Sequence, residues 1–498
     1  ELKKLIPMLI MAFFISFNYT ILRDTKDSLI VTSADAEAIP FLKTIGVVPM
    51  AILYMIIYTK LSNVLSRENL FYAAIAPFII FFGLFSTVIY PNRDLLHPTS
   101  LEWLTNILPA GWSGFVGMCR YWTFSLFYVM SELWGSAVLS LLFWGFANQI
   151  TKISESKRFY TLFGLGFNVA LMVSGPLIAY YGNMRKHLPA DADAWGVTLN
   201  YLMAMVTVAA VIIAATYYWM NRNVLTDERF YDPSEVKQSK KKLKMGIMES
   251  FLFILRSRYL LCLTIMVMGY GIAINIVEVT WKKYVGMQFS NPNDYVSFMG
   301  YFSTVTGIVT ILMILFVGGN VIRMKGWHFA ALFTPVVLTL TGLGFFSFVL
   351  LKDNPAVLEG LKAFGATPLL LAVLFGAAQN ILSKSTKYSL FDPTKEMTYI
   401  PLDPESKVKG KAAVDVVGAR LGKSGGSFIQ IVLFSLVGGI AQVTPYVAGI
   451  LLVIIAAWVV AVNFLNKDFH AKLEEKQNEE KEESERKKTT PQGTTVTA

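Results

Sequence analysis

Long apolar runs, separated by short polar segments, occupy most of the chain. A transmembrane helix needs about 20 mainly apolar residues, and many of these runs reach that length. We place the predicted spans near residues 5–31, 37–59, 69–90, 118–147, 157–182, 196–220, 259–284, 296–322, 327–351, 367–390, 412–440 and 444–466. The pattern therefore predicts an all-α polytopic membrane protein with about 12 transmembrane helices.

The first apolar run, Leu5 to Leu22, continues into charged residues without a small-residue cleavage site. We interpret it as a retained span and not as a signal peptide. Lys and Arg concentrate in the loops that share a side with the N-terminus, whereas the opposite loops hold few. Because basic loops stay on the cytoplasmic side, we expect both termini to be cytoplasmic.

A polar, basic segment divides the predicted spans into two groups of six. We expect an N-terminal six-helix bundle at 1–220, a basic cytoplasmic linker at 221–258 and a C-terminal six-helix bundle at 259–466. We expect the charged cytoplasmic tail at 467–498 to begin as a solvated helical extension and to end in disorder.

Short motifs recur at equivalent places of the two halves and in the same orientation. Asn63-Val64 matches Asn320-Val321 in one loop, and Glu155-Ser156-Lys157 matches Glu405-Ser406-Lys407 in another. Parallel repeats of this kind are typical of the major facilitator fold. We therefore expect a major facilitator-like arrangement of two six-helix repeats.

Composition supports the membrane assignment and narrows the chemistry. Hydrophobic residues make up 54% of the chain and charged residues only 16%, against about 25% charged in soluble domains. The net charge of +10 is explained by basic loops, so we expect no nucleic-acid partner. The two cysteines and four histidines form no disulfide, metal or His-based catalytic pattern. We expect no metal site, no cofactor and no enzymatic activity.

Charged residues inside the predicted spans are the most informative feature of the sequence. Each costs at least ~2.5 kcal/mol at bilayer depth, so it normally faces a partner or a cavity. Spans 3, 6, 9 and 12 are almost free of them, whereas spans 1, 4, 7, 10 and 11 carry many. These are the spans that line the cavity in a major facilitator arrangement. The charges are Arg23, Asp24, Lys26, Asp27, Glu132, Glu278, Lys384, Lys387, Asp415, Arg420 and Lys423.

We interpret these charges as a central site for an anionic substrate. The candidate phosphate-binding cations are Arg23, Lys26, Arg420 and Lys423. The candidate transport-essential or gating acids are Asp24, Asp27, Glu132 and Glu278, and the secondary candidates are Lys384, Lys387 and Asp415. The alternative for each residue is an inter-helix ion pair or a gate latch. We assign Arg120, Lys282 and Lys283 to the membrane interface, where long side chains reach water.

The string Gly418–Ser424 superficially suggests a phosphate-binding loop. It is one residue short of the Walker pattern, and no strand precedes it, so we reject that assignment. Freed backbone N–H groups beside Lys423 and Ser424 could still contact phosphate. The alternative is that these glycines mediate helix packing.

Four charged motifs resemble the nucleotide transporter family, the ATP/ADP translocases of plastids and obligate intracellular bacteria. They are Leu22-Arg-Asp-Thr-Lys-Asp27, Ser131-Glu-Leu-Trp134, Val277-Glu-Val-Thr-Trp-Lys282 and the stretch from Lys409 through Val417 to Gly426. The resemblance covers about 5–466 and is strongest to the chlamydial exchangers. In that family, charged residues of spans 1, 4, 7 and 11 are required. By motif they correspond to Lys26, Glu132, Glu278 and Lys423, with Lys409 and Lys411 near the last.

The resemblance implies exchange of host ATP for bacterial ADP by alternating access in a bacterial inner membrane. ATP and ADP are then substrates, inorganic phosphate is a candidate co-substrate, membrane lipid surrounds the protein, and we expect a monomer. We hypothesise that the cations neutralise the phosphates and that Glu132 and Glu278 hold those cations apart in the empty site. Candidates for contact with the base are Tyr128, Phe167, Asn168 and Asn275, and the alternative for the aromatic residues is lipid-facing packing.

Three other functions stay open at this stage. A proton-coupled importer of nucleotides or another organic anion would need a carboxylate that titrates near neutral pH, and Glu132 or Glu278 could serve. A membrane-embedded transferase would need a His or paired-carboxylate centre near one membrane face, which the sequence lacks. A channel fits two matched halves less well than alternating access does.

Overall fold

The computed structural model describes residues 1–226, 247–414 and 418–489, and leaves several helical side chains undescribed, including those of Arg420 and Lys423. Asp415 and these two side chains therefore lie outside the described part of the chain. The described elements that build the bundle are α-helical, with short π-helical and 3-10 segments between them. The prediction of an all-α membrane protein is confirmed.

The helices of the first half follow the predicted runs. They are α1 (Leu2–Ser33), α2 (Ala38–Phe41), η1 (Leu42–Val47), α3 (Val48–Ser62), α4 (Arg67–Leu84), η2 (Phe85–Ile89), α5 (Arg93–Leu96), α6 (Glu102–Ile107), η3 (Ala110–Trp112), α7 (Ser113–Arg120), α8 (Trp122–Trp134), η4 (Gly135–Phe143), α9 (Trp144–Ile150), α10 (Ile153–Asn183), η5 (Met184–His187) and α11 (Ala194–Asn223).

The second half begins with a short helix inside the expected linker. Its elements are α13 (Ile247–Leu255), α14 (Arg258–Gln288), α15 (Pro292–Leu312), η6 (Met313–Gly318), α16 (Gly319–Leu350), α17 (Pro355–Lys362), α18 (Pro368–Thr386), η7 (Lys387–Phe391), α19 (Asp392–Met397), α20 (Pro404–Ala413), α21 (Ala419–Val437) and α22 (Ile440–Thr489).

Ten described segments are long and apolar enough to cross a membrane. One of them, Pro292–Leu350, contains both predicted spans 8 and 9, and Gly326 with φ 80° interrupts it between them. The predicted span 412–440 appears as the shorter helix α21 after a gap in the described residues. The number of transmembrane helices stays a prediction.

Polar caps explain why several helices begin where they do. The side chain of Ser66 accepts a hydrogen bond from the backbone N–H of Asn69 at the start of α4, and Asp193 does the same for Gly196 at α11. Thr367 caps α18, and Pro368 follows it in the first helical turn. Such side chains satisfy backbone donors that the first turn leaves unpaired.

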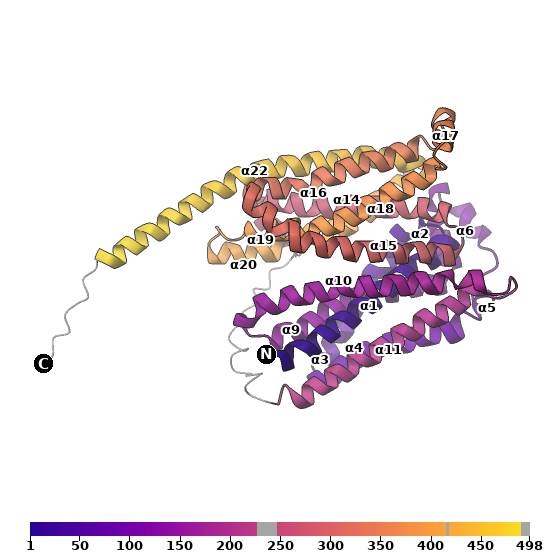
Figure 1. Cartoon of the computed structure of the whole chain (residues 1–498), viewed down its shortest axis with the longest axis horizontal. Helices are drawn as coiled ribbons and strands as arrows, with labels where there is room; N and C mark the ends of the chain where they lie inside the picture. Colours follow the sequence, from indigo (N-terminus) through magenta and orange to yellow (C-terminus); the bar gives the residue numbers. More distant parts are fainter. Residues whose placement is uncertain (227–246, 415–417, 490–498) are drawn as a thin grey trace.

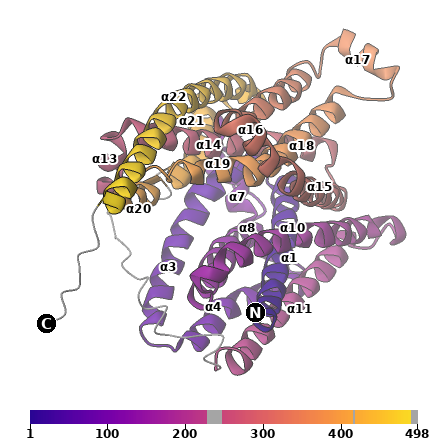
Figure 2. The ribbon, with the colours of Figure 1, turned by 60° about the vertical axis from the view of Figure 1, so that its left-hand side comes forward.

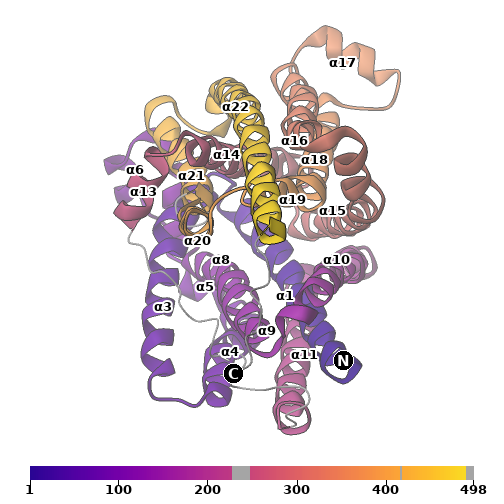
Figure 3. The same ribbon diagram turned by 90° about the vertical axis from the view of Figure 1, so that its left-hand side faces the viewer.

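Helices of the two halves form two groups that lie against each other (Figure 1), and a view along the helices shows the same grouping (Figure 3). Helix α10 of the first group packs along α15 of the second. Glycines permit this close approach, because a Cβ on Gly300 would lie 2.6 Å from the backbone N of Ala179. Helix α3 stands at the edge of the first group beside α4 (Figure 2) and has no buried residue.

We call the end of the bundle where α1 begins and α22 leaves it the terminal end, and the opposite end, with α2, α5, α6 and α17, the distal end (Figure 1). The start of α1 and the extension of α22 lie at the same end, as the predicted topology requires. The extension is helical as far as Thr489, and the expected disorder at the end of the tail stays a prediction. This segment is rich in Glu and Lys, which favour helix.

Candidate functional site

Charged side chains from α1, η1, α8, α14 and α18 gather at the centre of the bundle, between the two groups of helices. We call this set the charge cluster. It consists of Arg23, Asp24, Lys26, Asp27, Lys43, Glu132, Glu278, Lys282 and Lys384.

Lys26 ties α1 to α8. Its Nζ lies 2.8 Å from Oδ1 of Asp27 and 3.0 Å from Oε1 of Glu132, and the side chain is 2% exposed. The same ammonium group stands over the ring of Tyr128, 3.8 Å from its centroid. A buried lysine is stable only with such partners, because desolvation of an isolated charge costs several kcal/mol. Lys26 is therefore held by two carboxylates and one aromatic face.

The ion pairs continue from α1 into the second half. Nζ of Lys282 lies 2.8 Å from Oδ2 of Asp27 and 3.3 Å from Oε1 of Glu278. Nζ of Lys384 on α18 lies 3.7 Å from the same Glu278 oxygen. A continuous chain of alternating charges thus runs from Glu132 in the first half to Lys384 in the second.

Arg23 and Asp24 form a separate unit of the cluster with Ser303 of α15. Nε of Arg23 lies 2.9 Å from Oδ1 of Asp24, and the guanidinium also donates to Oγ of Ser303 at 2.7 Å. The Ser303 hydroxyl donates to the other Asp24 oxygen at 2.6 Å. Both carboxylate oxygens of Asp24 are therefore engaged, and this unit also joins the two halves.

Lys43 is a member that the sequence reasoning missed. It lies on the π-helical segment η1, and its Nζ donates to Oδ1 of Asn275 at 2.7 Å. The Asn275 amide nitrogen in turn donates to Oγ of Ser427 at 3.1 Å. A single lysine within predicted span 37–59 was the available signal, since ionisable residues at bilayer depth usually face a site.

Lys282 was assigned to the membrane interface, and that assignment is wrong. Its side chain is 2% exposed and pairs with Asp27 and Glu278 at the centre. Its neighbour Lys283 points to the distal end, where it pairs with Asp35. Sequence spacing alone could not separate them, because adjacent residues on a helix face directions about 100° apart.

Some of the remaining predicted residues lie in the charge cluster or against it, and others lie outside it. Lys384 belongs to the charge cluster, whereas Lys387 on η7 pairs with Asp392 at 2.7 Å, outside it. Tyr128 is fully buried under the Lys26 ammonium group. Phe167 packs on Phe143 and Trp144.

The two asparagine candidates already have hydrogen-bond partners. Asn168 donates to the carbonyl of Gly164 in its own helix, and both ends of the Asn275 amide are engaged. Contact of any of the four candidates with a base stays a prediction. No set of three metal-ligating side chains is found within the described ranges.

The members of the cluster differ in exposure, which separates a buried layer from an accessible one. Lys26, Asp27 and Lys282 are at most 2% exposed, whereas the side chains of Glu132, Glu278 and Lys384 are 28%, 20% and 21% exposed. An anion that enters the centre therefore meets the exposed layer first, and the buried layer holds that layer in position.

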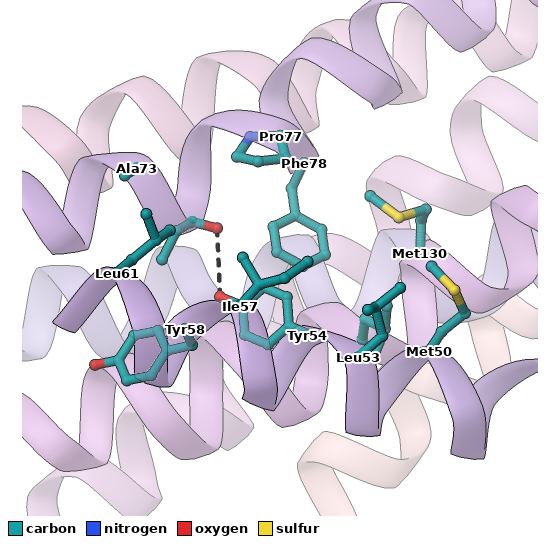
Figure 4. Close-up of a pocket in the computed structure, with 12 residues that line it drawn as sticks. Met50, Leu53, Tyr54, Ile57, Tyr58, Leu61, Ala73, Pro77, Phe78 and Met130 are labelled. Carbon is teal, nitrogen blue, oxygen red and sulfur yellow. Dashed lines mark hydrogen bonds between the residues drawn. The ribbon is translucent and has the colours of Figure 1, made fainter. Parts of the chain in front are cut away.

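A separate hollow has a different character. It is an apolar groove between α3, α4 and α8, lined by residues such as Met50, Tyr54, Phe78 and Met130 (Figure 4). It includes no member of the charge cluster. A multiply charged substrate would lose its hydration there without compensation, so the charge cluster is the better candidate site.

Residues 1–469 match the family described as TLC ATP/ADP transporter. The chain belongs to this family. Similar members include "ADP,ATP carrier protein 1" of Chlamydia muridarum, which is 58% identical over 482 residues, covering 96% of this chain and 91% of the relative. The chloroplastic "ADP,ATP carrier protein 1" of Arabidopsis thaliana is 51% identical over 485 residues, covering 97% of this chain and 76% of the relative. The family resemblance inferred from the four motifs is confirmed.

Solved structures give this TLC family chain the predicted fold. A bacterial homologue of the iron transporter ferroportin, in an inward-facing state, has a TM-score of 0.57 at 11% identity, covering 95% of this chain and 99% of that one. A D-xylose-proton symporter has a TM-score of 0.53 at 14% identity, covering 93% and 96%. These neighbours are major facilitator-like transporters, so that part of the fold prediction is confirmed.

Proposed function

We propose that this chain exchanges ATP for ADP across a bacterial inner membrane by alternating access at the charge cluster. The observation that carries the proposal is the chain of ion pairs from Glu132 through Lys26, Asp27 and Lys282 to Glu278. It crosses from one helix group to the other, so a change in its pairing changes how the halves are joined. The similar carriers named for ADP and ATP support the choice of substrate.

Alternating access follows from competition for the same cations. In the empty site the carboxylates of Glu132 and Glu278 neutralise Lys26, Lys282 and Lys384. The phosphates of a nucleotide replace these carboxylates as partners, and the bonds between the halves rearrange. Charge-assisted hydrogen bonds are the stronger class, so an empty cluster resists this rearrangement and a loaded one permits it. We assign Arg23, Arg420 and Lys423 to the same phosphate-binding set.

The remaining parts of the proposal concern orientation and stoichiometry. We propose cytoplasmic termini and a monomeric carrier that imports ATP. ATP carries about one more negative charge than ADP, and moving one charge across 100 mV is worth about 2.3 kcal/mol. Inorganic phosphate that accompanies ADP would cancel this charge. Uptake that responds to an imposed membrane potential in phosphate-free vesicles, and loses this response when phosphate is added, would support co-movement.

The decisive test is counter-exchange in reconstituted vesicles. Vesicles loaded with ADP should take up labelled ATP, and empty vesicles should not. Lys26→Ala leaves Glu132 without its ion-pair partner and leaves Asp27 with Lys282 alone. We expect uptake to fall at least tenfold, since removing one partner of a buried pair costs about 3–5 kcal/mol. Lys60→Ala, at an exposed lysine of α3, is the matched control.

Two outcomes would contradict the proposal. Equal uptake into empty and loaded vesicles would exclude exchange. Uptake into empty vesicles that appears only with an inward proton gradient would favour the proton-coupled importer, with Glu132 or Glu278 as the titrating group.

A further inference from the structure

Lys43 differs from every other described cation of the charge cluster in its partners. Arg23, Lys26, Lys282 and Lys384 each have a carboxylate oxygen within 4.0 Å. The described partner of Lys43 is instead the neutral amide of Asn275, at 2.7 Å. Since an amide oxygen carries only a partial charge, it compensates an ammonium group less well than a carboxylate does.

The charge balance of the described cluster also indicates that the positive charge of Lys43 is incompletely compensated. Its five cations face four carboxylates, so one positive charge is left over. Lys43 lies within electrostatic reach of Glu278, Lys282, Glu132 and Lys26, and it is half-buried, in contrast to the fully buried Lys26. The excess charge therefore sits on a side chain that an incoming anion can reach.

The bond of Lys43 also joins the two halves. Lys43 lies on η1 of the first half, and Asn275 lies on α14 of the second and is hydrogen-bonded to Ser427 of α21. A ligand that takes the ammonium group away from Asn275 removes this connection. The π-helical geometry of η1, which is common at functional sites, sets the direction in which Lys43 leaves its helix.

We propose that Lys43 contacts the phosphate groups of the nucleotide, and that its bond to Asn275 is the empty-state bond which the phosphate replaces. The inference rests on the proposed exchange of ATP and ADP and adds one residue and one bond to it. Asn275 then competes with the substrate for Lys43. Lys43 and Asn275 have opposite effects on substrate affinity, which a purely structural tie would not produce.

The test compares Lys43→Met, Lys43→Arg and Asn275→Ala in the same counter-exchange assay. A hydrogen bond to a charged group contributes about 1.5–3 kcal/mol, so Lys43→Met should raise KM for ATP and for ADP about tenfold or more. Lys43→Arg keeps the charge and should recover most of the affinity. Asn275→Ala removes the competitor and should lower KM.

Two matched variants and one direct measurement distinguish a lost contact with the substrate from a folding defect. Lys60→Met changes an exposed lysine of α3, just beyond the end of the predicted span that holds Lys43, and should leave KM unchanged. Ser427→Ala removes the second partner of Asn275 without touching Lys43. The rise in melting temperature of the purified protein on addition of ADP should shrink in Lys43→Met and persist in Asn275→Ala. Lys43→Gln replaces Lys43→Met if the latter does not fold.

The outcomes are distinct. If wild-type vesicles do not exchange ATP for ADP, the proposed function fails before any variant is measured. If the wild type exchanges and Lys43→Met keeps its KM, the inference about Lys43 is wrong while the function stands. If Lys43→Met and Asn275→Ala both raise KM to a similar degree, the bond is a structural tie between the halves, and the inference is equally overturned.

Discussion

The two ends of the bundle hold their helices together in different ways. At the distal end, described bonds cross between the helix groups: Glu37 accepts from the backbone N–H of Ile440 at 2.9 Å, and Asn293 donates to Thr198 at 2.8 Å. At the terminal end, described pairs such as Lys4–Glu155 and Lys411–Glu396 stay within one group. The contacts that fasten one half to the other are therefore concentrated at the centre and the distal end.

The distal contacts depend on small residues as well as on hydrogen bonds. Segment 91–117, which lies between the predicted spans 69–90 and 118–147, contributes Gly111 and Gly114. A Cβ on Gly111 would overlap the carbonyl oxygen of Phe434 in α21, and one on Gly114 would overlap the backbone of Glu37. Trp112, between them, donates to Ser435 of α21 at 2.8 Å. The loop thus seals the distal end by backbone contacts that tolerate no side chain.

In the proposed alternating-access cycle the joined end is the closed one, so we expect the charge cluster to open towards the terminal end. With the proposed topology this is the cytoplasmic side. The distal end therefore joins the halves by directional hydrogen bonds, whereas pairs within one half need only hold that half together. The three predictions below test this difference.

Gly111→Ala should have the largest effect. The added methyl group meets backbone and not a flexible side chain, so the distal end cannot close as it does here. Overpacking costs about 1–3 kcal/mol, and we expect exchange to fall about fivefold to more than a hundredfold. Gly83→Ala is the matched control, since a Cβ there meets nothing within 4 Å. Wild-type exchange by Gly111→Ala would show that the distal contact is not needed for closure.

Glu37→Ala should have an intermediate effect. It removes the acceptor for Ile440 at the start of α22, the acceptor for Ser113 and a charge near Lys283. Loss of a helix cap costs about 0.5–2 kcal/mol, which corresponds to about a twofold to thirtyfold increase in opening at the distal end.

A cysteine at Ser28 measures this opening, because Ser28 is buried beside Pro292. After Cys119 and Cys262 are replaced, an impermeant thiol reagent from the distal side should label Ser28→Cys faster in Glu37→Ala. Glu37→Gln keeps an acceptor oxygen and should label at an intermediate rate. Equal labelling rates in all three proteins would show that Glu37 does not help to close the distal end.

Glu155 at the terminal end should give the smallest effect, on stability and not on closure. Partial burial raises the pKa of Glu155, but hydrogen bonds from the Lys4 ammonium group and the Lys152 backbone N–H outweigh this and lower the pKa below its usual value. Because the folded-state pKa is the lower one, the stabilisation is complete above the unfolded-state pKa of about 4.3 and is lost as the pH falls through the folded-state pKa.

Melting temperatures of wild type and Glu155→Gln measure this contribution. The wild type should be more stable at pH 7, by about 1 kcal/mol, and the difference should shrink below about pH 4. Distal labelling of Ser28→Cys should be the same in both. A change in labelling would mean that the terminal pair also controls the distal gate, and the contrast between the two ends would be lost.

Much of the candidate site was predictable because a charged side chain at bilayer depth is costly and therefore indicates a partner or a functional site. Arg23, Asp24, Lys26, Asp27, Glu132, Glu278 and Lys384 were selected on this ground, and the structure brings them together. Lys282 was misplaced and Lys43 was overlooked for the same reason: each lies near a predicted span end, where a long side chain can reach either water or the centre. Which of the two such a side chain reaches depends on how its helix is rotated in the bundle.

The amino-acid sequence was enough to establish the membrane class, the number of apolar runs, the spans that carry charge and, through four motifs, the family. These follow from local properties: apolar length, the cost of buried charge and residue identity. The tertiary structure alone decided which charges pair, that Lys43 meets Asn275 and that loop 91–117 packs on α21. Those contacts join residues far apart in the chain, and their geometry depends on how whole helices rotate and approach, which no local pattern records.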